Sequence, residues 1–154
     1  MASGVERFLE RAKDLGLEIE VREFPVGTRT AADAAAAIGC DVAQIVKSLV
    51  FVAGDRPVLV LTSGANRVDE ARLADHLGTT TVRKADADEV RAATGYTIGG
   101  TPPFGHDTEL AIWCDRDLTT HRQVWAAAGT PTTVFPIAPE ILVRTTGARV
   151  LDVS

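Results

Sequence analysis

The sequence predicts one mixed α/β (α+β) domain over residues 1–154, in which a central, mixed, barrel-like β-sheet is surrounded by helices. Helix-like and strand-like segments are interspersed along the chain, and many strand-like segments follow one another through short turns. A regular parallel array would need a helix between each pair of strands, so a mixed or mostly antiparallel sheet fits better. Hydrophobic residues make up 45% of the chain, which suits one buried core.

The first part of the chain predicts two helices, a strand and a hairpin. Ser3 and Glu6 form a capping box, and Thr30 caps an alanine-rich segment. Two apolar runs separated by a turn sequence predict the hairpin. In chain order, the elements are a helix over 3–16, a strand over 18–24, a helix over 30–39, a short turn capped by Asp41, and strands over 46–52 and 58–62 around a turn at 54–57.

The second part predicts three helices, shorter strands and one long loop. Asp69 and Asp86 are N-cap residues, a glycine closes each helix, and Pro139 suits the first position of the last helix. The elements are helices over 69–78, 86–95 and 139–147, strands over 80–83, 110–114, 123–127, 132–135 and 149–153, and a glycine- and proline-rich loop over 96–106.

Charge and composition narrow the function classes. The chain has 16 basic and 21 acidic residues and a formal net charge of −5, which argues against broad, non-specific nucleic-acid binding. A small site that grips only the end of a nucleic acid remains compatible with this charge. Charged residues interrupt the N-terminal segment, and the apolar runs are strand-sized, so we expect a cytoplasmic protein without membrane contact.

Familiar metal and nucleophile motifs are missing from the sequence. Cys40 and Cys114 belong to no CxxC pair, and we expect two buried free thiols rather than one disulfide. The three histidines do not combine at metal-ligand spacing, so no metal site is predicted. The chain contains no GxSxG, no P-loop and no GxGxxG fingerprint. Any catalysis is therefore expected to lack a protein nucleophile.

Two features could carry chemistry. Lys47 interrupts an apolar run, so its ammonium points either to solvent or into a cleft, where it could pair with phosphate or polarise a carbonyl. The segment GGTPPFGH over 99–106 is either a tight surface turn or a stiff loop that aims backbone N–H groups at a ligand. His106 could act as an acid or base, but a hydrogen bond to the loop backbone is the favoured interpretation.

Other polar residues carry less weight on pattern alone. Asp115 precedes an arginine and an aspartate, a cluster typical of a solvated strand end. Scattered basic residues are commonly solvated as well. The best candidates for phosphate contact among them are Arg67, Arg72, Arg83 and Lys84.

The order of these motifs resembles the YbaK family of aminoacyl-tRNA deacylases, which includes freestanding relatives of the editing insertion of prolyl-tRNA synthetase. The matching segments are IVKSLVF, GYTIGGTPPFGH, the helices at TAADAAAAIG and VDEARLADHLG, and the ending GTPTTVFPIAPEILVRTTGARVLDV. The resemblance implies a compact mixed α/β fold with a barrel-like sheet and no metal or organic cofactor. It also implies hydrolysis of the ester at the terminal adenosine of a tRNA, with the acceptor end, and in some cases a synthetase, as the partner.

The resemblance also assigns residues to the site. It makes Lys47, Gly99 and Gly100 the expected catalytic residues. Loop N–H groups would stabilise the oxyanion, each contributing roughly 2.7–4 kcal/mol, and Lys47 would hold a phosphate or ribose group. Water or a group of the substrate itself, such as a ribose hydroxyl or a thiol, would attack the ester. The expected substrate-binding residues are Thr101, Pro102, Pro103, Phe104, Gly105, His106, Asp115 and Gly129.

Several alternatives stay open at this point. Thr101 and the double proline lie where pocket size is set, which leaves alanine, cysteine, serine and threonine esters all possible as substrates. A non-catalytic adaptor with the same fold would bind tRNA or a synthetase. A small-molecule hydrolase on this scaffold would turn over free esters or amides without tRNA.

Overall fold

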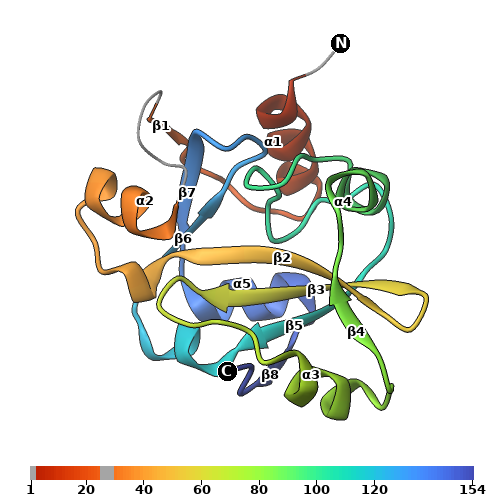
Figure 1. The fold of residues 1–154 in the computed structure, drawn as a ribbon. Coiled ribbons are helices and arrows are strands. Elements are labelled where there is room, and N and C mark those ends of the chain that lie inside the picture. Colours follow the sequence, from red (N-terminus) through yellow and green to blue (C-terminus); the bar gives the residue numbers. More distant parts are fainter. Residues whose placement is uncertain (1–2, 25–29) are drawn as a thin grey trace.

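The computed structural model describes residues 3–24 and 30–154 and has the mixed α+β fold that the sequence predicts (Figure 1). The helices are α1 (Gly4–Asp14), α2 (Ala31–Ile38), α3 (Glu70–Leu77), α4 (Ala87–Thr94) and α5 (Pro139–Thr146), with short 3₁₀ helices η1 (Val42–Gln44) and η2 (Arg116–Thr120). The strands are β1 (Arg22–Glu23), β2 (Val46–Ala53), β3 (Arg56–Ser63), β4 (Val82–Lys84), β5 (Ala111–Asp115), β6 (Val124–Ala127), β7 (Thr133–Ile137) and β8 (Arg149–Leu151).

The described strands form two sheets, and neither sheet closes into a barrel. One is an antiparallel sheet with the order β1-β7-β6. The other has the order β4-β2-β3-β5-β8, with antiparallel pairs at β4, β2 and β3 and parallel pairs from β3 to β8. An isolated parallel bridge between Ile45 and Trp125 joins the two sheets. In place of the predicted barrel-like sheet, the structure therefore has two open sheets that are linked at this bridge.

Local capping explains where the helices begin. The side chains of four N-cap residues each accept the N–H three positions later: Ser3, Thr30, Asp69 and Asp86. Glu89 completes a capping box with Asp86. Glycines with positive φ end α2, α3, α4 and α5. These boundaries confirm the helix predictions within a residue or two.

Two strand predictions need correction. The strand expected over 18–24 is only Arg22–Glu23, because β7 pairs with just these two residues. The alternation before them comes from three side chains that pack on the main core without a strand partner: Leu17, Ile19 and Val21. The hairpin turn is also shorter than predicted, since Ala53 pairs with Arg56. Pro57 lies within β3, where β5 begins to pair only at Val58.

The main core lies between α1, α5 and the inner faces of the sheets, and it fixes part of the long loop. The rings of Phe8, Phe104 and Phe135 pack together with centroids 5.2, 5.0 and 5.8 Å apart. These rings come from α1, the 96–106 loop and β7. The loop is thus anchored to the fold through a buried aromatic residue near its C-terminal end.

Both cysteines are free thiols, as expected, although Cys40 is only half-buried. Burial, together with the nearby charge of Asp115, raises the pKa of the Cys114 thiol to about 12, so Cys114 is not an activated thiol. The part of the chain that the structure describes contains no group of three or more potential metal ligands. Its helices include none with the length and apolar character of a membrane span.

Candidate functional site

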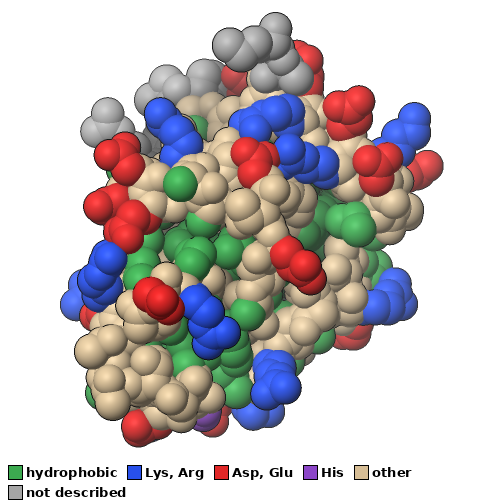
Figure 2. All heavy atoms as spheres, turned by 90° about the vertical axis from the view of Figure 1, so that its right-hand side faces the viewer, with side chains coloured by type: hydrophobic (Ala, Val, Ile, Leu, Met, Phe, Trp, Pro, Cys, Tyr) green, Lys and Arg blue, Asp and Glu red, His purple; other side chains and the backbone are tan. Residues whose placement is uncertain are grey.

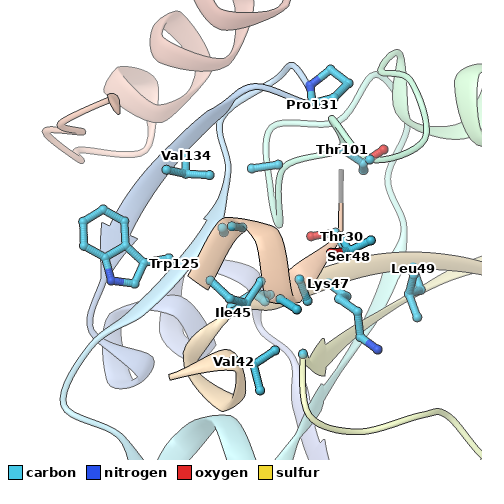
Figure 3. Close-up of a pocket in the computed structure, with 18 of the residues that line it drawn as sticks. Thr30, Val42, Ile45, Lys47, Ser48, Leu49, Thr101, Trp125, Pro131 and Val134 are labelled. Carbon is cyan, nitrogen blue, oxygen red and sulfur yellow. The ribbon is translucent and has the colours of Figure 1, made fainter. Parts of the chain in front are cut away.

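A cavity of about 520 Å³ lies where the two sheets meet, and it is the best candidate for the functional site (Figure 3). Residues of α2, β2, β6, β7 and the 96–106 loop line it. Its wall is mostly apolar, with Ile45, Trp125 and several alanines, and carries a few polar side chains. This volume and this mixture are typical of small-ligand sites. Its hydroxyl and charged side chains are Thr30, Lys47, Ser48, Thr101 and Thr133.

Lys47 borders the cavity and is partly buried. Its Nζ donates to the backbone carbonyl of Asn66 at 2.6 Å, in the connection between β3 and α3. Burial lowers the pKa of Lys47, and the nearby charges of Lys84 and Arg67 lower it further, while Asp115 raises it. Figure 3 shows Lys47 and Ser48 projecting from opposite faces of β2, as strand alternation requires. Lys47 is therefore a partly desolvated cation at the rim of the cavity, and its hydrogen bond to Asn66 fixes its position.

Asp115 is buried and binds the residue that accepts the hydrogen bond of Lys47. Its side chain is 2% exposed, which differs from the solvated strand end expected from the sequence. One carboxylate oxygen accepts the Ser63 N–H at 3.0 Å and the Asn66 side-chain amide at 2.9 Å, and the other accepts the Asp117 N–H at 3.0 Å. Asp115 thus positions the Asn66 segment that receives Lys47, and it does not line the cavity itself.

The glycine loop approaches the cavity through a tight turn. The Gly100 N–H donates to the Thr97 carbonyl at 3.0 Å, and Gly99 between them has φ of 83°, as in a type II turn. A side chain at Gly100 would lie 2.8 Å from the backbone of Thr130, so only glycine fits there. Gly99 and Thr101 line the cavity, and in the described part of the chain their backbone N–H groups donate no hydrogen bond. These two loop N–H groups are therefore available as donors for a ligand.

Two arginines of α1 hold the two ends of the loop. Arg11 donates to the Gly105 carbonyl at 2.7 Å and pairs with Asp107 at 2.7 Å. The Tyr96 hydroxyl donates to the same carbonyl at 3.0 Å. Arg7 donates to the Gly95 carbonyl at 2.6 Å. The first helix therefore serves as a clamp on the segment 95–107.

His106 has a structural place in the loop. Its Nε2 lies 2.7 Å from the Pro102 carbonyl, and burial lowers the pKa of its imidazole. Gly129 has φ of 107° and packs against the backbone of Gly4, near the turn that Gly100 contacts. Of the residues predicted for the site, three line the cavity: Lys47, Gly99 and Thr101. The others, which hold the loop or the lysine, are Gly100, Pro102, Pro103, Phe104, Gly105, His106, Asp115 and Gly129.

The basic residues suggested for phosphate contact lie in three different surroundings. Lys84 and Arg67 lie close enough to Lys47 to lower its pKa. Arg83 is engaged by Glu89 through two contacts of 2.7 and 2.8 Å. Arg72 lies on α3.

Some cavity residues carried no signal in the sequence. Trp125 and Ala126 of β6 and the helix start at Thr30 form much of the wall, but they read as ordinary core and capping residues. Ser48 lies in no nucleophile motif, so the sequence gives no reason to single it out. Only the pairing of distant strands brings these residues together.

Comparison with known proteins gives a consistent picture. A family model for the aminoacyl-tRNA editing domain matches residues 26–145. A proline–tRNA ligase of Ligilactobacillus salivarius is 33% identical over 118 residues, which are 71% of this chain and 21% of the ligase. The chain thus spans only a small part of such ligases. The Bacillus subtilis protein YwhH, itself uncharacterized, is 32% identical over 128 residues, which cover 81% of this chain and 80% of that protein.

A solved structure extends the likeness to the whole chain. It is described as a candidate trans-editing enzyme for prolyl tRNA synthetase, and it superposes with a TM-score of 0.94. The sequences are 42% identical, and the match covers 100% of this chain and 98% of the other. The likeness therefore includes α1, which lies outside the residues that the family model matches.

Proposed function

Because this chain belongs to the aminoacyl-tRNA editing domain family, we propose that it is a cytoplasmic trans-editing enzyme that hydrolyses the ester of a mischarged aminoacyl-tRNA. The observation that carries the proposal is the cavity itself. A partly desolvated lysine and two backbone N–H donors border one largely apolar space of about 520 Å³. That combination suits a small amino acid attached to a ribose.

The residues have separate roles in this mechanism. The N–H groups of Gly99 and Thr101 would donate to the ester oxygen as it becomes an oxyanion, while Gly100 lets the loop lie close to the 130–131 turn. Each such donor contributes roughly 2.7–4 kcal/mol in the transition state. Lys47 would leave the Asn66 carbonyl to hold a phosphate or ribose oxygen of the acceptor end.

The attacking group is proposed to be water or a group of the substrate. Cys114 is buried with a raised pKa, and no histidine lines the cavity, so the described residues offer no activated nucleophile there. Hydrolysis then depends on orientation and on oxyanion stabilisation. The proposed chemistry breaks the ester C–O bond and releases the free amino acid and the tRNA hydroxyl.

A deacylation panel tests the proposal. Alanyl-, cysteinyl-, seryl- and threonyl-tRNA would be incubated with wild type, Lys47→Ala and Lys13→Ala, the last a change of an exposed lysine on α1. We expect turnover of one or two esters. The Lys47 variant should lose about 100-fold or more, as for the removal of one preorganised transition-state contact, and the Lys13 variant should match wild type.

Two other outcomes would replace the proposal. Wild type that binds tRNA or a synthetase but hydrolyses none of the four esters would be an adaptor. Wild type that hydrolyses alanine methyl ester as well as alanyl-tRNA would be a general small-ester hydrolase. The cavity and the retained Lys47 favour the deacylase over both.

A further inference from the structure

We propose that Ser48 binds the α-ammonium group of the aminoacyl moiety and so selects substrates with a free amino group. The proposal rests on the proposed function, because it assigns one more group of the same ester to the same cavity. Three observations on the described residues support it: the Ser48 hydroxyl has no hydrogen-bond partner, the strand edge beside it has no partner strand, and the cavity wall has no carboxylate.

The Ser48 hydroxyl differs from the other hydroxyl and charged side chains of the cavity wall. Its Oγ is buried and has no hydrogen-bond partner in the part of the chain that the structure describes. Each of the others is satisfied within the chain: Thr30 by Asp33, Lys47 by Asn66, Thr101 by Thr97, and Thr133 by Thr130.

An unpaired buried hydroxyl destabilises a fold, and native proteins leave few of them. Ser48 lies on the same face of β2 as Val46 and Val50, which belong to the main core. An alanine there would pack as well without the unpaired oxygen. The hydroxyl needs only to turn about χ1 to change its direction, and a ligand in the cavity would supply its missing partner.

The backbone of Ser48 adds a second acceptor at the same place. The Ala85 N–H donates to the Val50 carbonyl at 3.0 Å, so this carbonyl points away from β3. Antiparallel pairing directs the peptide groups of alternate residues to the same edge, so the Ser48 carbonyl points that way too. β4 pairs with β2 only at Phe51–Ala53, and among the described strands that edge has no partner at Ser48.

An ammonium group matches these two acceptors. It carries donors only, and a hydroxyl and a carbonyl oxygen can both accept from it. The described residues that line the cavity include no Asp or Glu, so no carboxylate competes for it. The other polar groups of the ester are already assigned, with the carbonyl at the Gly99 loop and the ribose or phosphate at Lys47. The α-ammonium group is what remains.

A binding experiment tests the assignment without relying on turnover. The probe is 3′-deoxy-3′-(L-alanylamino)adenosine, whose amide does not hydrolyse readily, and its partner is the same compound with an acetylated amino group. Calorimetry would give the affinity of both for wild type, Ser48→Ala and Ser48→Thr. A hydrogen bond to a charged group predicts a loss of about 10- to 100-fold for Ser48→Ala with the free amine. Threonine should restore most of the affinity.

Acetylation provides the decisive comparison. Wild type should bind the acetylated probe more weakly than the free amine, and Ser48→Ala should bind the acetylated probe as wild type does. If Ser48→Ala lost equal affinity for both probes, the hydroxyl would bind a group other than the amine, which would overturn the assignment. Unchanged binding of the free amine by Ser48→Ala would overturn it as well.

A stability control separates a ligand-binding hydroxyl from a structural one. The Ser63 hydroxyl in β3 donates to the Ala43 carbonyl at 2.8 Å, so Ser63→Ala should lower the melting temperature. Ser48→Ala should leave it unchanged or raise it, because no hydrogen bond is lost. A fall as large as that of Ser63→Ala would show that Ser48 is structural and would overturn the proposal.

Failure of the proposed function looks different. In that case wild type binds neither probe and hydrolyses none of the four aminoacyl-tRNAs, and both proposals fall together. If wild type binds the free amine and hydrolyses an ester while Ser48→Ala behaves identically, only the Ser48 assignment falls.

Discussion

At the scale of single residues, Lys47 shows how a surface-like sequence position becomes a site. Strand alternation alone left its direction open between solvent and cleft. The structure holds its ammonium on the Asn66 carbonyl and surrounds it with the charges of Lys84 and Arg67. Burial and like charge both disfavour the protonated form of Lys47, so its pKa is lower than that of a solvated lysine.

The first prediction concerns the titration of this lysine. The chain has three lysines, so ¹³Cε-lysine NMR should show three signals, and the signal of Lys47 should titrate below the ordinary lysine pKa of 10.5. Lys84→Ala should raise its pKa because a like charge is removed, and Asp115→Asn should lower it because an attractive charge is removed. A Lys47 signal that titrates at 10.5, or whose pKa changes in neither variant, would contradict this account.

The same shift fixes two pH dependences. The folded-state pKa of Lys47 lies below its unfolded value of 10.5, so between the two the unfolded chain binds more protons and stability rises with pH. Deacylation that uses the ammonium should instead decline as pH rises through the lowered pKa. Urea unfolding and deacylation rates across alkaline pH would show these opposite trends, and Lys47→Ala should abolish the first.

Asp115 gives the second prediction. Asp115→Ala leaves the buried Ser63 N–H unpaired and releases the Asn66 amide, so the free energy of unfolding should fall by about 1–3 kcal/mol. Asp117→Ala removes the exposed carboxylate that also accepts from the Asn66 amide, and it should change the free energy of unfolding by less than about 0.5 kcal/mol. Urea unfolding measures both. Similar losses for the two variants would show that burial of Asp115 is not what matters.

At the scale of elements, α1 and the 96–106 loop behave as one unit although they are distant in sequence. Arg7 and Arg11 reach carbonyls on both sides of the loop, and Phe8 packs against Phe104. The turn at Gly99, which carries the proposed donors, lies between these anchors. Accurate placement of the N–H groups therefore depends on a helix that does not line the cavity.

The third prediction follows from this clamp. Arg11→Ala removes the hydrogen bond to Gly105 and the ion pair to Asp107, which should lower the free energy of unfolding by about 1 kcal/mol. Hydrogen exchange of the loop amides and the deacylation rate should both report a looser loop. Arg91→Ala, an exposed change on α4, is the matched control. Loop exchange that stays at the wild-type rate would show that the Phe104 packing alone holds the loop.

The elements also show what a sequence can predict. Helix boundaries depend on neighbours, such as Asp86 with Glu89, and were correct within a residue or two. The strand over 18–24 was too long because strand pairing requires a partner, and β7 meets only Arg22–Glu23. The burial of Asp115 and the unpaired hydroxyl of Ser48 depend on contacts with distant segments, so no local pattern could reveal them.

At the scale of the whole molecule, the open arrangement of two sheets creates the site. A closed barrel would pair the β2 edge along its length, whereas among the described residues the bridge between Ile45 and Trp125 is the one strand pairing that links the two sheets. The cavity lies beside the part of β2 that does not pair with β4. The departure from the predicted barrel is thus the feature that makes room for a ligand.

Charge distribution at this scale limits how tRNA can be bound. The net charge is −5, and Figure 2 shows acidic and basic side chains interspersed on one face without a continuous basic surface. Lys47 borders the cavity, and Lys84 and Arg67 are the two cations whose charges act on it. Such a molecule should contact only the few phosphates next to the aminoacylated end.

The fourth prediction is therefore weak tRNA binding with a shallow salt dependence. If three cations each neutralise one phosphate of the single-stranded end, the slope of log K against log salt should be about −2, with micromolar or weaker affinity. Lys84→Ala should reduce the slope by about 0.7, and Arg83→Ala should leave it unchanged because Glu89 already engages that side chain. Fluorescence anisotropy with labelled tRNA between low and moderate salt gives these slopes. Tight binding with a steep slope would mean that a much larger surface contacts the tRNA, and that the cavity is only one part of the interface.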